Sequence, residues 1–96
     1  MERILCAAIH LEDSVLHEHQ PKNILTGFVV CGRRHHNCFA TLALTGVSHI
    51  GAIQGFLTSD DRFVSRAEGW RIAKAAGQII TDSVYEEKGL ISEDLY

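Results

Sequence analysis

Two arginines, two histidines and a cysteine lie between two apolar runs in the segment VVCGRRHHNCFATLAL, residues 29–44. Three kinds of chemistry suit these residue types. Cysteine and histidine can bind a metal, the arginines can bind an anion, or the arginines can pair with some of the chain's twelve carboxylates. The function of the protein depends on which of the three applies.

The spacing of the cysteines argues against a zinc site. Structural zinc sites commonly use paired cysteines with about two residues between them. Here the six residues 32–37 separate Cys31 from Cys38, and the chain has only three cysteines in all. Cys38 fits an apolar helix face better, as a small core residue. We therefore expect no bound metal and no cofactor.

An anion site fits this segment better. A strand is expected to end at Gly32, and a helix begins a few residues later. The free amides at a helix N-terminus carry a charge of about +0.5, and arginine forks match phosphate oxygens. The alternative, in which the arginines form ion pairs with the chain's own acids, stays open. The predicted phosphate ligands are Arg33, Arg34, His35, His36 and Asn37.

A nucleotide-like ligand would also need an aromatic ring to stack on its base. The segment QGFLTSDDRFVSR offers Phe56 and Phe63. A stacked base is worth about 1–3 kcal/mol, although most phenylalanines in short strands are core residues. Phe56 shares its strand face with polar Gln54 and Thr58, so it is the better candidate. Thr58, Ser65 and Arg66 complete the predicted pocket.

The elements that position these residues form one expected domain, residues 1–96. We expect strands at 3–11, 24–32, 53–58 and 62–64, a helix from His36 toward Gly46, and a second helix that ends at Gly77. Residues 65–68, SRAE, form a capping box for the second helix. The order predicts an α+β fold, a small, mostly antiparallel sheet with two helices packed against it. The apolar tail LISEDLY should pack on this subunit or on a neighbour.

Composition excludes several classes of protein. The formal net charge of −3 argues against a general DNA or RNA binder. The first apolar run covers only residues 4–11, too short for a signal peptide or a membrane span, so we expect no membrane partner. Three cysteines, an odd number, indicate a reducing cytoplasm.

No catalytic motif is present, since the sequence lacks GxSxG, HExxH and a P-loop. The segment SRAEGWRIAKAAGQI is faintly similar to the Nudix helix, but residues 73–77 lack its metal-binding glutamates. Adjacent Asp60 and Asp61 suit a turn. We therefore expect a protein that is not an enzyme. The alternatives are a small enzyme acting on a nucleotide or nucleotide sugar, and an interaction module that binds no small molecule.

The segments GRRHHNC, QGFLTSDDRFVSRAEGWRIAKAAGQI and SEDLY resemble a family of small phage proteins, the anti-Thoeris sponges. The resemblance implies a homo-oligomer, at least a dimer, with ligand pockets where protomers meet. Such a protein would capture a cyclic ADP-ribose-type signal intact in the host bacterial cytoplasm, so that the defence effector never receives the signal. Some members of that family also bind cyclic oligonucleotides. The family's pocket arginine and adenine-binding aromatic map onto Arg34 and Phe56, with Ser65 or Arg66 nearby.

Overall fold

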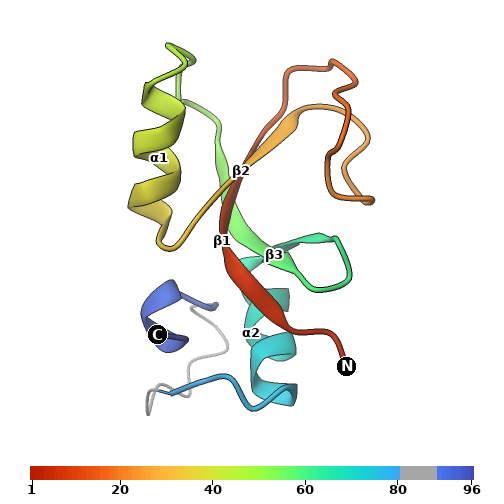
Figure 1. Cartoon of the computed structure of the whole chain (residues 1–96), viewed down its shortest axis with the longest axis vertical. Helices are drawn as coiled ribbons and strands as arrows, with labels where there is room; N and C mark the ends of the chain where they lie inside the picture. The colour runs from red at the N-terminus through yellow and green to blue at the C-terminus, as the bar shows by residue number, and fades with distance from the viewer. Residues whose placement is uncertain (81–88) are drawn as a thin grey trace.

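A four-stranded antiparallel sheet with two α-helices forms the structure, a computed structural model that describes residues 1–80 and 89–96. The sheet order is β2-β1-β3-β4, so β2 and β4 are the edge strands (Figure 1). The α+β prediction is therefore confirmed. In chain order the elements are β1 (Ile4–Leu11), β2 (Phe28–Gly32), α1 (His35–Ala43), β3 (Ile53–Thr58), β4 (Phe63–Ser65), α2 (Arg66–Ala75) and the short 3₁₀ helix η2 (Ser92–Asp94).

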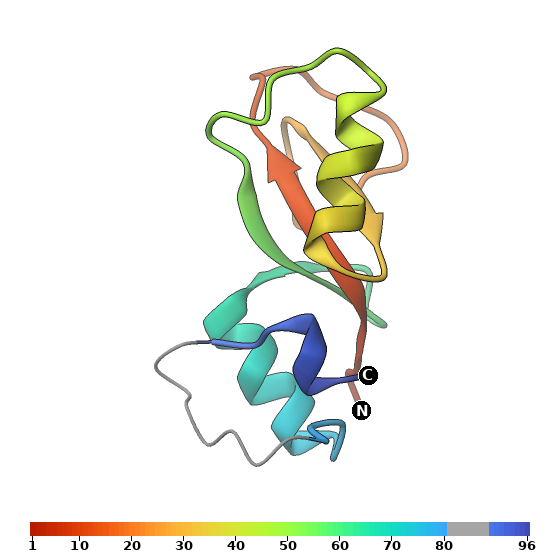
Figure 2. The same ribbon diagram turned by 90° about the vertical axis from the view of Figure 1, so that its left-hand side faces the viewer.

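Both helices cover the same face of the sheet, and register explains why. Ala7 pairs with Phe56, which in turn pairs with Val64, so their side chains point to one face. Helix α1 packs over the β1–β2 half of that face, and α2 packs over the β3–β4 half (Figures 1 and 2). Both termini lie in the half of the molecule that contains α2, and Figure 1 shows them on opposite sides of that helix.

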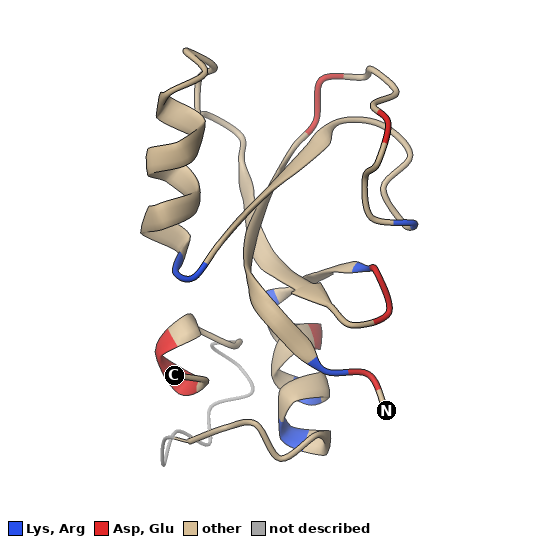
Figure 3. Cartoon of the chain, viewed as in Figure 1, with Lys and Arg blue, Asp and Glu red and all other residues tan. Residues whose placement is uncertain are grey.

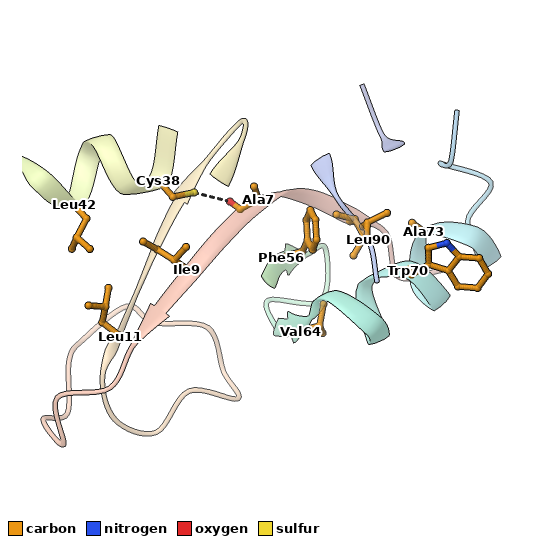
Figure 4. Close-up of a cluster of buried hydrophobic side chains, with 11 residues drawn as sticks. Ala7, Ile9, Leu11, Cys38, Leu42, Phe56, Val64, Trp70, Ala73 and Leu90 are labelled. Carbon is orange, nitrogen blue, oxygen red and sulfur yellow. Dashed lines mark hydrogen bonds between the residues drawn. The ribbon is translucent and has the colours of Figure 1, made fainter. Parts of the chain in front are cut away.

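The hydrophobic core runs under both helices. The thiol of Cys38 on α1 donates to the main-chain oxygen of Ala7, at 3.6 Å (Figure 4). Under α2, Phe56 and Leu90 are both fully buried and lie side by side. Gly69 makes this packing possible, because a Cβ at this position would come within 3.1 Å of the Phe56 ring. The tail that carries Leu90 thus packs on its own subunit, one of the two predicted alternatives.

The second strand is shorter than predicted. The sequence predicts a strand over 24–32, but β2 begins at Phe28. Gly27 has φ +81°, and its amide donates to the main-chain oxygen of Val15. The amide of Ile24 donates to Pro21 in a turn. The main-chain amides of Ile24 and Gly27 are therefore already hydrogen-bonded outside the sheet. For this reason residues 24–27 do not pair with β1, despite their β-branched and apolar side chains.

The predicted helix ends agree with the structure to within three residues. Ser65 caps α2, accepting a hydrogen bond from the Glu68 amide at 3.2 Å. The Glu68 carboxylate completes no capping box but pairs with Arg62, at 3.2 Å. Gly77, with φ +70°, follows the C-terminus of α2, as predicted.

Replacing the central core ring tests this account of the packing. We expect Phe56→Leu to lower the free energy of unfolding by about 1–2 kcal/mol, because the smaller side chain leaves space under α2. Urea denaturation followed by the fluorescence of Trp70, which is 6% exposed, measures the change.

Leu16→Ala is the matched control, since Leu16 is 80% exposed and its loss should change stability by less than about 0.5 kcal/mol. Equal stability of Phe56→Leu and the wild-type protein would show that the ring is not a core residue.

Candidate anion-binding site

The turn between β2 and α1 brings two arginines against the C-terminal segment. Arg33 and Arg34 immediately precede α1, and the acidic residues of η2 lie beside them (Figure 3). Arg33 is exposed and Arg34 is partly exposed, whereas Cys38 and Leu42 of α1 are buried in the core. The predicted cluster is thus a real cluster of charge at the surface.

Arg34 is the centre of this contact, and only 23% of its side chain is exposed. Its guanidinium donates to the Ser92 hydroxyl at 3.3 Å and lies 3.5 Å from a carboxylate oxygen of Glu93. It also donates to the main-chain oxygen of Tyr96. Three acceptors of one tail therefore gather around one guanidinium, in the way that the oxygens of a phosphate gather around an arginine.

Tyr96 gives the two arginines a shared aromatic partner. The guanidinium carbon of Arg33 lies 5.4 Å from the centroid of its ring, and that of Arg34 lies 5.1 Å from it. Both distances are typical of a cation–π contact, worth about 0.5–1 kcal/mol at an exposed site. The Tyr96 hydroxyl donates to the main-chain oxygen of Arg33, and burial raises the pKa of this phenol. The ring itself is only half-buried.

His35 and Asn37 shape the start of α1. The His35 ring donates through Nε2 to the main-chain oxygen of Gly55 at 2.8 Å, and its edge contacts Phe56. Burial lowers the pKa of His35, so this ring is neutral at neutral pH. The Asn37 Oδ1 accepts a hydrogen bond from the main-chain amide of Arg34 at 3.1 Å, and this bond caps the start of the helix. His36 is exposed beside them.

Arg66 and Ser65 belong to the second helix, and Arg66 holds the beginning of the tail. Its Nε donates to the main-chain oxygen of Leu90 at 3.1 Å, and the Leu90 amide donates to the main-chain oxygen of Arg66 at 2.8 Å. The positive charge of Arg66 also acts on the pKa of His35, which places Arg66 near the start of α1. Ser65 is the α2 cap, with its hydroxyl on the Glu68 amide.

Two predicted pocket residues lie in the interior of this structure. Phe56 has 0% exposed surface, so no base can stack on its ring in this structure. Thr58 is 1% exposed, and its hydroxyl donates to Glu2 at 2.6 Å. Gln54 is exposed, but its polarity did not indicate an open strand face, because α2 and Leu90 cover the part of that face where Phe56 lies. Only the tertiary packing of segments that are far apart in the sequence shows that Phe56 is covered.

The sequence interpretation missed the tail as part of the site. The sequence interpretation treated the tail LISEDLY as apolar and used SEDLY for the family resemblance, although SEDLY carries the acid and the ring that contact the arginines. The composition of this segment could have indicated the contact, since an acidic segment that contains a tyrosine complements a pair of arginines. The alternative of ion pairs within the chain is therefore confirmed for Arg34, through Glu93.

Within residues 1–80 and 89–96, no group of three or more His, Cys, Asp or Glu side chains is arranged to hold a metal ion. No helix in the same described part of the chain is long and apolar enough to cross a membrane.

Fold and site together define a small α+β protein with a basic turn facing an acidic tail. Residues 3–96 match the family model described as Phage T4 y16D protein, and because the match covers nearly the whole chain, the chain belongs to this family. No curated protein and no solved structure matches it. Membership places the chain among phage proteins, whereas the resemblance to the anti-Thoeris sponges stays a prediction.

Removing the Arg34 guanidinium should loosen the end of the tail but not its beginning. We expect Arg34→Ala to speed amide hydrogen exchange at Asp94, Leu95 and Tyr96 by roughly 5- to 30-fold, as for a loss of about 1–2 kcal/mol. Leu90 should exchange as before, because its amide is bonded to Arg66 and its side chain is buried. Exchange measured by NMR resolves both ends.

Arg3→Ala is the control, since Arg3 is also an exposed arginine but has no contact with the tail among those described. Exchange at residues 94–96 that stays within twofold of wild type in Arg34→Ala would contradict the role given to this guanidinium.

Proposed function

We propose that this phage protein binds a cyclic ADP-ribose-type immune signal in the host bacterial cytoplasm and sequesters it without chemical change. One observation carries the proposal. Two guanidinium groups at the start of α1 flank a half-buried aromatic ring, and Arg34 already binds acceptors of the kind that a pyrophosphate offers. The resemblance to the anti-Thoeris sponges supplies the class of ligand.

The tail occupies the proposed phosphate position in the free protein. The Glu93 carboxylate is the group that a phosphate would replace, because it carries the same charge to the same guanidinium. Its side chain is 61% exposed and its contact of 3.5 Å is long. An exposed ion pair of this kind is worth about 0–1 kcal/mol, so its loss costs the protein little. A doubly charged pyrophosphate gains more from two arginines than one carboxylate does.

Tyr96 takes the role that the sequence assigned to Phe56. Its ring lies beside both arginines and keeps exposed surface, whereas Phe56 has none. Stacking of a purine on such a ring is worth about 1–3 kcal/mol, comparable to a charged hydrogen bond. Leu90 stays buried as the anchor, so the end of the tail can shift while its beginning holds.

Calorimetric titration with cyclic ADP-ribose isomers tests the site. We expect Arg34→Ala to weaken binding roughly 10- to 100-fold, as for the loss of a charged contact of about 1.5–3 kcal/mol. Glu93→Gln should have the opposite effect and tighten binding, because the neutral amide competes less for Arg34. The ligand released by heating should be chemically intact by mass spectrometry.

Arg3→Ala serves as the control for lost positive charge and should bind like the wild type. Phe56→Leu, corrected for its folded fraction, should also keep its affinity. Absence of binding to every isomer overturns the proposed ligand class, and recovery of a cleaved ligand would instead identify an enzyme.

We also propose that the protein self-associates, as the resemblance implies. Four exposed apolar side chains support this, and they follow one another from the end of α1 to the start of β3: Leu44, Val47, Ile50 and Ile53. Burial of this segment between two copies would remove apolar surface from water, worth about 25 cal/mol per Å².

Sedimentation velocity should show a dimer or larger assembly that Ile50→Asp dissociates. Leu16→Asp is the matched control, since Leu16 is also exposed, at 80%, but lies in the loop between β1 and β2. A wild-type protein that sediments as a monomer at all concentrations up to those used for titration would contradict self-association.

A further inference from the structure

Two cysteines from different strands lie together on the sheet face that the helices do not cover. Cys31 on β2 pairs directly with Ala8 on β1, and Cys6 precedes Ala8 by two residues. Because side chains alternate along a strand, Cys6 and Cys31 share one face and are diagonal neighbours. Cys31 is exposed on an edge strand, whereas Cys6 is half-buried.

The two thiols interact, and they do so unequally. The neighbouring Cys6 thiol lowers the pKa of Cys31 to about 7. The neighbouring Cys31 sulfur, together with burial, raises the pKa of Cys6. Cys6 thus keeps its proton while Cys31 gives up its own near neutral pH. The thiolate is the nucleophilic form of cysteine, so the exposed member of the pair is the reactive one.

We propose that Cys31 is a modification site for low-molecular-weight disulfides such as glutathione disulfide, with Cys6 as the positioning residue that holds its thiolate. This inference rests on the strand pairing, which makes the two cysteines neighbours on one face, and on the exposure of Cys31, and it does not depend on the proposed nucleotide ligand.

The reaction is a thiol–disulfide exchange. The Cys31 thiolate attacks one sulfur of the small disulfide, and a bond forms between that sulfur and Cys31 as the original S–S bond breaks. The other half leaves as a thiolate and takes a proton from solvent. The Cys31 sulfur is oxidised and one half of the disulfide is reduced, so no further oxidant is needed.

The third cysteine provides a control within the same chain. Cys38 is 0% exposed on the helix-covered face, and burial raises its pKa to about 11. Its thiol is also bonded to the main-chain oxygens of Ala7 and Arg34. A buried protonated thiol reacts slowly, so Cys38 should stay unmodified under conditions that modify Cys31.

Intact-mass spectrometry after incubation of the native protein with glutathione disulfide at pH 7 tests the site. We expect the wild type and Cys38→Ser to gain one glutathionyl group, or to lose two hydrogens if Cys6 then displaces it. Both products begin with attack by Cys31, so Cys31→Ser should form neither. Modification of Cys31→Ser at the wild-type rate, or an unreactive wild type, would overturn the proposal.

The role of Cys6 is tested by the pH dependence of Cys31 alkylation with iodoacetamide, located by peptide mapping. In Cys6→Ala the midpoint should move upward toward that of an ordinary thiol, because the hydrogen-bond donor is gone. Cys6→Ser, whose hydroxyl can donate, should restore part of the shift. An identical pH profile in all three proteins would show that Cys6 does not hold the thiolate.

Discussion

The packing around Phe56 is the constraint on which the rest of the structure depends. This ring pairs across the sheet with Ala7 and Val64, and on its helix-covered side it meets three segments that are far apart in sequence. The His35 ring contacts its edge, Gly69 lets α2 approach it closely, and Leu90 lies beside it. One buried side chain thereby fixes the start of α1 and the start of the tail relative to each other. The arginines and the acidic residues can meet only because these two starting points are fixed.

The contact between the basic turn and the tail combines a firm anchor with weak outer bonds. Leu90 is fully buried, which is worth about 1.5–3 kcal/mol, and Arg66 adds two hydrogen bonds at the same point. Beyond it, the exposed Glu93 pair and the cation–π contacts of Tyr96 are each worth about 1 kcal/mol or less. Such a gradient of stability along one short segment suits a tail that yields its terminal contacts to a more highly charged competitor and then returns.

The end of β2 places different residues on the two faces of the sheet because alternate residues of a strand face opposite ways. Gly32 faces the core, where a side chain would come within 3.0–3.3 Å of Asn37 and Cys38. Its neighbour Cys31 faces outward and meets Cys6 from the adjacent strand. The strand then runs directly into the arginine turn. The thiol pair and the arginine turn are thus adjacent in the chain.

The sequence by itself determined the elements whose signals are local. The cap at Ser65, the stop at Gly77, the strand over 53–58 and the α+β class all follow from neighbouring residues, and so does the gathering of charge at Arg33 and Arg34. Only the tertiary structure decided which ring is accessible. Phe56 and Tyr96 are both aromatic residues among polar neighbours, and their exposure depends on where α2 and the tail pack. Local sequence cannot contain this information, because burial is a property of segments that meet across the fold, and the same holds for Cys6 and Cys31, which only strand register brings together.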